Sequence, residues 1–140
     1  MLLLDNSAWS RVVAGTLPGE AADAVAGWLE ARDLATCLPF LLEAGYSATA
    51  AADHRAMMED FERLYPRVEL TVATEELAVR AQGELAKRGH HRLPPIDLMI
   101  AACAHEAGMG VLHYDRDYDR ILQLTSLSFE SVWVAPAGSL

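Results

Sequence analysis

Short runs of apolar residues alternate along the chain with longer segments in which apolar residues recur every three or four positions. The short runs predict strands. Five such strands are expected, at Leu2–Leu4, Leu34–Cys37, Val68–Val72, Gly110–His113 and Phe129–Val134. The first run is apolar at every position, which is typical of a strand buried on both faces of a sheet.

The longer segments predict helices, and their boundaries are marked by capping residues, prolines and glycines. The helices are expected to follow Asp5 directly and to occupy about 18–33, 39–46, 53–65, 74–89 and 94–108, with Thr74 as a cap. Strands separated by helices indicate a parallel sheet, because parallel neighbours need long crossover connections. We therefore expect an α/β sandwich with a central, mainly parallel sheet of about five strands, forming one domain over 1–140.

Composition and charge narrow the class of protein. The chain has 140 residues, 52% of them hydrophobic, which is enough for one sizeable core. Its formal charge of -9 argues against a protein that holds nucleic acid mainly through positive surface charge. Cys37 and Cys103 form no Cys-x-x-Cys pair, so a zinc or redox motif is not expected. With no signal-peptide pattern and no run of ~18 apolar residues, a cytoplasmic protein that does not enter a membrane is expected.

Four acidic residues lie at junctions with apolar elements, where acids are unusual. Asp5 follows the first strand and Asp115 follows the strand at 110–113, while Glu43 and Asp97 interrupt apolar helical segments. In an open α/β sheet, ligands bind beyond the carboxyl ends of the strands. Neighbouring strands would bring Asp5 and Asp115 to that edge, and the two helices could present Glu43 and Asp97 to the same crevice.

Carboxylates gathered in one place repel one another unless a divalent cation supplies the opposite charge. An all-oxygen ligand set suits Mg²⁺ or Mn²⁺ and not Zn²⁺. Such ions take some of their ligands from substrate phosphate, activate water and stabilise the charge of a leaving oxygen. The pattern therefore predicts hydrolysis of a phosphodiester.

Each acid also has a simpler interpretation on its own. Asp5 is a favoured helix cap, and Asp97 is a favoured first-turn acid. Glu43 can turn to solvent on a helix, and the alternating charges of 115–119 are usual for a solvated turn. If the acids only cap helices, the chain is a non-catalytic binding partner. If the substrate differs, the same chemistry describes a DNA nuclease or another phosphohydrolase.

Taken together, the acidic segments resemble the four motifs of PIN domains, and more closely the VapC toxins of bacterial VapBC toxin-antitoxin pairs. The resemblance spans the chain in order. It rests on Leu2-Leu3-Leu4-Asp5-Asn6-Ser7, Leu42-Glu43-Ala44, Pro95-Ile96-Asp97-Leu98-Met99-Ile100-Ala101-Ala102 and His113-Tyr114-Asp115-Arg116-Asp117-Tyr118-Asp119.

The resemblance implies a PIN-like α/β/α fold and a Mg²⁺- or Mn²⁺-dependent endoribonuclease. Such a toxin cuts cellular RNA, often tRNA or ribosomal RNA, forms dimers and is silenced by a VapB antitoxin. Carried over by position, the catalytic and metal-binding carboxylates are Asp5, Glu43, Asp97 and Asp115, with Asp117 as an additional metal ligand. Ser7 matches a hydroxyl that supports the site, whereas His113 stands where many members have Thr or Ser.

Contact with RNA needs positive charge near these acids. The segment Arg80–Arg92 carries four basic residues and one acid, with His90 and His91 beside them, so we expect it to face phosphate. Cations at a helix C-terminus are an equally good explanation of this segment. The residues expected to bind substrate are Arg92, Arg116 and Ser7, with Arg11 and Arg120 near the acidic motifs.

Overall fold

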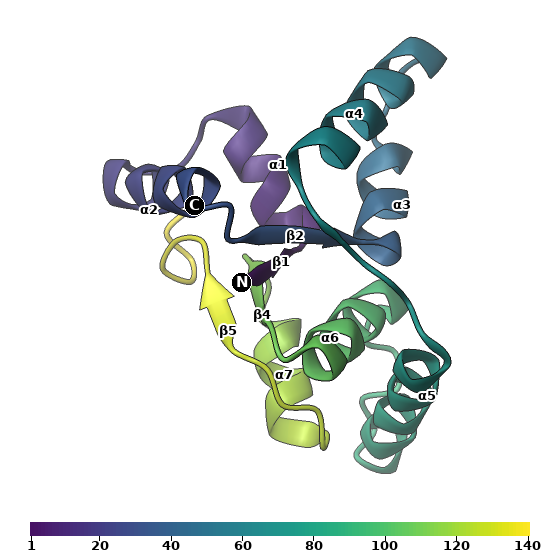
Figure 1. Cartoon of the computed structure of the whole chain (residues 1–140). Coiled ribbons are helices and arrows are strands. Elements are labelled where there is room, and N and C mark those ends of the chain that lie inside the picture. Colours follow the sequence, from purple (N-terminus) through teal and green to yellow (C-terminus); the bar gives the residue numbers. More distant parts are fainter.

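The computed structural model describes residues 1–140, and a sheet of short strands runs through its centre (Figure 1). The strands are β1 (Leu2–Leu4), β2 (Leu34–Cys37), β3 (Arg67–Val68), β4 (Gly110–His113) and β5 (Ser131–Trp133). The helices that connect them are α1 (Asn6–Ala14), α2 (Gly19–Glu30), α3 (Leu38–Tyr46), α4 (Ala51–Leu64), α5 (Val72–Lys87), α6 (Pro95–Ala107) and α7 (Asp117–Leu124). None of these helices is long and apolar enough to cross a membrane.

All five strands are parallel, in the order β3-β2-β1-β4-β5. Helices α1 to α4 lie on one side of the sheet and α5 to α7 on the other (Figure 1). Strand β1 at the centre is apolar and buried at every position, as expected for a strand covered on both faces. The α/β sandwich with a five-stranded parallel sheet is confirmed.

The strand order reverses between β1 and β4, the two central strands. After β1 the chain forms β2, which pairs with one edge of β1, and then β3. It returns only after α6 to form β4, which pairs with the opposite edge of β1. Leu4 pairs with Leu112, and the Asp5 amide donates to the Leu112 carbonyl at 3.1 Å. The residues that follow these two strands therefore meet at one edge of the sheet, which is where open α/β sheets bind ligands.

An aromatic cluster on the α1 to α4 side fixes three helices to one another. The ring of Trp9 on α1 lies 5.2 Å from that of Phe61 on α4, and Phe61 lies 5.1 Å from Phe40 on α3. Offset and edge-to-face rings of this kind each add about 0.5–1.5 kcal/mol beyond their buried area. The cluster holds α1 and α3 in the positions from which they present Asp5 and Glu43.

Two boundaries differ from the sequence prediction around residue 70. Strand β3 covers only Arg67–Val68, and α5 begins at Val72 instead of after a cap at Thr74. Thr71 is the cap, and its hydroxyl accepts from the Thr74 amide at 3.2 Å while the Thr74 hydroxyl accepts from the Thr71 amide. This capping box outweighs the strand preference of the β-branched residues here.

Helix α7 was not predicted, because the charged run that begins it is also typical of a solvated turn. Tyr118 and Ile121, spaced three apart, are fully buried and give the helix its apolar face. Strand β5 covers Ser131–Trp133 instead of Phe129–Val134, although Val134 still donates to the His113 carbonyl at 2.8 Å beyond its end. The predicted helix at 53–65 is α4, which begins two residues earlier.

Candidate active site

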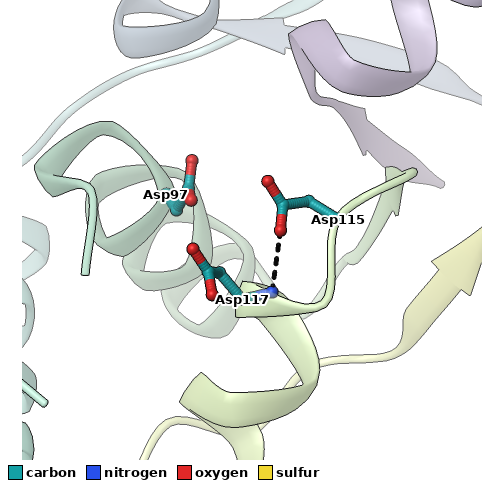
Figure 2. Close-up of side chains that lie close together, drawn as sticks. All are labelled: Asp97, Asp115 and Asp117. Atoms are coloured by element: carbon teal, nitrogen blue, oxygen red, sulfur yellow. Dashed lines mark hydrogen bonds between the residues drawn. The ribbon is translucent and has the colours of Figure 1, made fainter.

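Three aspartates from different elements meet at the carboxyl edge of β1 and β4 (Figure 2). Asp97 lies in the first turn of α6, Asp115 follows β4, and Asp117 is the first residue of α7. One carboxylate oxygen of each lies within 4.8 Å of the other two. Asp115 Oδ1 also accepts from the Asp117 amide at 2.9 Å, which fixes the turn between them.

The environment of Asp97 opposes its ionisation. The residue is 7% exposed, and burial raises its pKa from 3.8 to about 8. The negative charges of Asp5, Asp115, Asp117 and Glu43 contribute to this rise, in that order after burial. Without a cation, Asp97 is therefore largely protonated at neutral pH, since like charges held together cannot all ionise.

Two buried carboxylate oxygens have no hydrogen-bond partner. They are Oδ2 of Asp97 and Oε2 of Glu43. Burial raises the pKa of Glu43, as do the charges of Asp5 and Asp115. A buried oxygen without a partner is costly and uncommon, and a divalent cation that prefers oxygen ligands would satisfy it. The residues present therefore fit a hard ion such as Mg²⁺ or Mn²⁺.

Asp5 has one of the two roles that the sequence left open, that of a helix cap. It caps α1, because its Oδ2 accepts from the Ser7 amide at 2.8 Å and from the Ser7 hydroxyl. Its Oδ1 accepts from the Tyr118 hydroxyl at 2.8 Å. Asp5 is not among the three converging aspartates, although its charge raises the pKa of Asp97. Oδ1 keeps one lone pair, so metal binding by Asp5 stays a prediction.

Ser7 and Tyr118 hold the two strand ends together. The Ser7 hydroxyl accepts from the Tyr114 amide at 2.8 Å and so links the start of α1 to the end of β4. Tyr118 is fully buried, and burial together with the charge of Asp5 raises its pKa, so its hydroxyl remains a donor. Sequence analysis missed Tyr118. Its signal was the three-residue spacing to Ile121, which marks a helix face. Contact of Ser7 with substrate stays a prediction.

Comparison with known proteins shows the family of this chain. The family model of the PIN domain matches residues 2–122. The chain belongs to the PIN-domain family. Within it, the chain belongs to the VapC group. Ribonuclease VapC18 of Mycobacterium tuberculosis is 35% identical over 98% of this chain and 97% of its own length. Ribonuclease VapC2 of the same species is 41% identical over 70% of this chain and 71% of its own length.

Solved structures share the fold of this PIN domain at low sequence identity. A DNA-bound VapBC from Salmonella typhimurium matches with a TM-score of 0.72 and 18% identity, over 96% of this chain and all of that one. VapBC2 from Rickettsia felis, bound to a DNA fragment from its promoter, matches with a TM-score of 0.71 and 12% identity, over 93% and 97%.

In this PIN domain, His113 belongs to a buried hydrogen-bonded chain that ends on Asp115. Its Nδ1 accepts from the Asp115 amide at 3.1 Å, and its Nε2 lies 2.7 Å from the Ser131 hydroxyl. Ser131 donates to Asp119 at 2.8 Å, so Nε2 must carry the proton and donate to Ser131. Trp133 also donates to Asp119, at 3.3 Å. Burial lowers the pKa of His113, consistent with a neutral ring.

The basic residues of the PIN domain fall into distinct groups. Arg120 pairs with Asp117 at 2.7 Å, and Arg116 is exposed at the start of α7. Arg11 donates to the Ser7 carbonyl at 2.6 Å and lies 4.0 Å from the centre of the Tyr114 ring. Arg92 is exposed in the connection between α5 and α6. The roles of Arg92 and Arg116 in binding substrate stay predictions.

Proposed function

We propose that this PIN domain is a Mg²⁺- or Mn²⁺-dependent endoribonuclease, the toxin of a type II VapBC pair, and that it hydrolyses phosphodiester bonds of cellular RNA such as tRNA or ribosomal RNA. The observation that carries the proposal is the convergence of Asp97, Asp115 and Asp117, together with the buried, unpaired carboxylate oxygens of Asp97 and Glu43. The ribonuclease names of the VapC relatives support the choice of RNA as substrate.

Asp97, Asp115 and Asp117 would hold the cation, with Asp5 beside them. When bound, the cation activates a water and stabilises the charge that develops on the leaving oxygen. Asp97 gives up its proton on binding, so the affinity for the ion rises with pH up to about 8. Two hydrogen bonds fix the position of Asp115. Its own amide donates to His113, and its side chain accepts from the Asp117 amide.

Glu43 is proposed to accept a proton from the attacking water. Its Oε2 is buried without a partner, and its pKa is raised by burial and by neighbouring acids. A general base works best when its pKa lies near the operating pH, so this shift favours the role. Ser7 and Tyr118 hold Asp5 and the two strand ends, and Ser7 is also proposed to contact the substrate.

A VapB-type antitoxin is the proposed partner, as supported by the VapBC complexes that share this fold. A groove of about 500 Å³ between α1 and α4 is open to solvent and mainly apolar, and its walls include Trp9, Val13, Met57, Phe61 and Leu64. We assign it to an apolar segment of the antitoxin. We also propose that the protein is a single-domain homodimer that acts in the cytoplasm.

Asp97→Asn tests the proposed function, because it removes a carboxylate from the cluster and keeps the size of the side chain. We expect the wild-type protein with Mn²⁺ to cleave a panel of tRNA and ribosomal RNA fragments. The variant is expected to lose about two orders of magnitude or more in rate and to bind Mn²⁺ more weakly. Cleavage is followed on gels and Mn²⁺ affinity by calorimetry.

Asp53→Asn is the matched control, since Asp53 is likewise an acid in a first helical turn but is exposed on α4. It should leave both measurements unchanged. Equal cleavage and Mn²⁺ affinity in wild type and Asp97→Asn would refute the proposal. Preferential cleavage of DNA fragments of the same length, tested beside the RNA panel, would support a DNA nuclease. If no substrate is cleaved and Mn²⁺ does not raise the melting temperature, the result would support a binding partner.

A further inference from the structure

A second hollow adjoins the acidic cluster and has the opposite charge. It measures about 220 Å³ and lies between the α5–α6 connection and α7. Three basic side chains line it: His90, Arg92 and Arg120. Asp117 is the only acid in its wall, and this residue also belongs to the three-aspartate cluster. The basic pocket, as we call it, is therefore continuous with the candidate active site.

Basic residues of the segment that precedes α6 lie in two separate hollows. His90 and Arg92 line the basic pocket, whereas Lys87 and Arg88 line a separate hollow together with Glu84. Glu84 is itself held by the Ser126 hydroxyl at 2.7 Å. Only part of the segment therefore faces the acids, which the linear sequence did not distinguish.

Arg120 joins the pocket to the cluster. Its Nη1 lies 2.7 Å from Asp117 Oδ1, and its side chain is 57% exposed against 18% for Asp117. An exposed pair three residues apart on a helix contributes little to stability, so the arginine can exchange its partner at low cost. The guanidinium is paired with the carboxylate of Asp117, so a cation bound at the cluster would compete with it for that carboxylate.

Charge and shape favour phosphate as the occupant of the basic pocket. Arginine presents a planar fork of donors that matches phosphate oxygens, and two arginines face one small hollow here. A strand whose scissile phosphate lies at the aspartates must place a neighbouring phosphate beside them. The basic pocket is a cationic surface that has Asp117 in its wall.

We propose that the basic pocket is a subsite for a phosphate next to the scissile one in a single-stranded segment of RNA. Arg120 exchanges Asp117 for this phosphate when a divalent cation binds the aspartates. Arg92 and His90 contact the same phosphate from the α5–α6 connection. This inference rests on the proposed ribonuclease function and names the contacts that hold its substrate.

Equilibrium binding tests the subsite without requiring turnover. The probe is a short, fluorescein-labelled, mixed-sequence single-stranded RNA, with Ca²⁺ in place of Mg²⁺ and gels to confirm that the RNA stays intact. We expect Arg92→Ala and Arg120→Ala each to weaken binding about tenfold. The slope of log affinity against log salt concentration should fall by about 0.7 for each variant, because one phosphate contact is lost.

Mn²⁺ affinity, measured by calorimetry without RNA, gives an independent readout. Arg120→Ala should bind Mn²⁺ more tightly than wild type, because a competing cation has left Asp117. Arg92→Ala should bind Mn²⁺ nearly as the wild type does. A merely structural role of Arg120 predicts the opposite sign, since loss of support for Asp117 would weaken both Mn²⁺ and RNA.

Two control variants remove positive charge elsewhere. Arg63→Ala breaks the pair of Arg63 with Asp60, which is also three residues apart on a helix, with a separation of 2.8 Å. Arg88→Ala removes an arginine of the same basic segment that lies outside the pocket. Both should leave RNA affinity close to that of wild type and Mn²⁺ affinity unchanged.

RNA affinity of Arg92→Ala and Arg120→Ala equal to that of the controls would overturn the subsite. Weaker Mn²⁺ binding by Arg120→Ala would overturn the exchange of partners. Competition by inorganic phosphate at concentrations comparable to the RNA would show a site for a free anion and overturn the assignment to a strand. If the wild type cleaves no RNA but the two variants still lose affinity, the subsite holds and the nuclease proposal fails.

Discussion

The aspartates of the cluster differ in what holds each of them. Asp115 is tied to Asp117 through a side-chain hydrogen bond and to His113 through its amide, whereas one oxygen of Asp97 has no partner. Burial is costly for such an oxygen unless it gains a ligand. The hydrogen-bonded residues Asp115 and Asp117 set the geometry of the cluster. Asp97 supplies the carboxylate whose protonation changes when an ion binds.

The His113 ring connects two parts of the site, and the shorter side chain of a Thr or Ser at this position could not make the same connection. Its ring spans from the Asp115 amide to Ser131, so β5 and Asp119 act on the loop after β4. A buried polar chain is stabilising only when every member has a partner. The neutral ring, with Nε2 as donor and Nδ1 as acceptor, satisfies this condition.

Ser131→Ala should weaken the site from a distance. The buried Nε2–H of His113 would lose its acceptor, which costs about 1–3 kcal/mol, and the ring would no longer be held toward Asp115. We expect a lower free energy of unfolding in urea and a several-fold loss of Mn²⁺ affinity. Ser126→Ala, which removes an exposed hydroxyl bonded to Glu84, is the control. Unchanged Mn²⁺ affinity in Ser131→Ala would contradict the role of the hydrogen-bonded chain.

At the level of elements, the site depends on how closely β1 and β4 approach each other. Gly110 begins β4, and a Cβ atom there would lie 2.6 Å from Leu2 Cδ2 and 3.0 Å from the Glu130 carbonyl oxygen. The tip of the Leu2 side chain can move. The Glu130 carbonyl cannot move as easily, because it belongs to the backbone that leads into β5. Glycine is therefore required for the spacing that brings Asp5 and Asp115 to one edge.

Gly110→Ala should destabilise the protein by about 1–3 kcal/mol, the usual cost of overpacking a core. Because β4 must shift, we also expect weaker Mn²⁺ binding. Gly27→Ala provides a control of opposite sign, since Gly27 is exposed within α2 and a Cβ there meets nothing within 4 Å. That variant should be more stable by about 0.5–1 kcal/mol in urea unfolding. A Gly110→Ala protein as stable as wild type would show that β4 can move freely.

Over the whole molecule, the protonation of Asp97 makes the stability of the fold depend on pH. Asp97 in the folded protein holds its proton to about pH 8, whereas its ordinary pKa is 3.8. The folded state therefore binds more protons than the unfolded state between these values. By linkage, the Asp97 contribution is fully present below about pH 4 and is lost as the pH rises toward 8.

Urea unfolding in EDTA at several pH values between about 4 and 8 measures this dependence. We expect the wild type to lose stability relative to Asp97→Asn as the pH rises. The lowered pKa of His113 acts in the opposite direction near its ordinary value of 6.5, so the difference between the two proteins is the informative quantity. Saturating Mn²⁺ should abolish the loss in wild type. Parallel curves without metal would contradict a raised pKa for Asp97.

Much of this architecture could be predicted from local pattern. The apolar run Leu2–Leu4 and the prolines and glycine that bound α6 are local signals, and they correctly indicated a parallel sheet with helices between its strands. The acids at 5, 97 and 115 stood out because each interrupts or ends such a pattern. The charged run that begins α7 was ambiguous, because the spacing of Tyr118 and Ile121 is a weak signal beside so many charges, and only the core shows that both side chains are buried.

The linear sequence by itself determined the order of the five strands and the first six helices, and the acids at their junctions, because periodicity and capping act over a few residues. Only the tertiary structure decided which oxygens converge, which one Tyr118 holds, and which basic side chains face Asp117. Those contacts join positions as far apart as Asp5 and Tyr118, 113 residues along the chain. Their distances depend on how the layers pack around β1 and β4, and no local pattern encodes that packing.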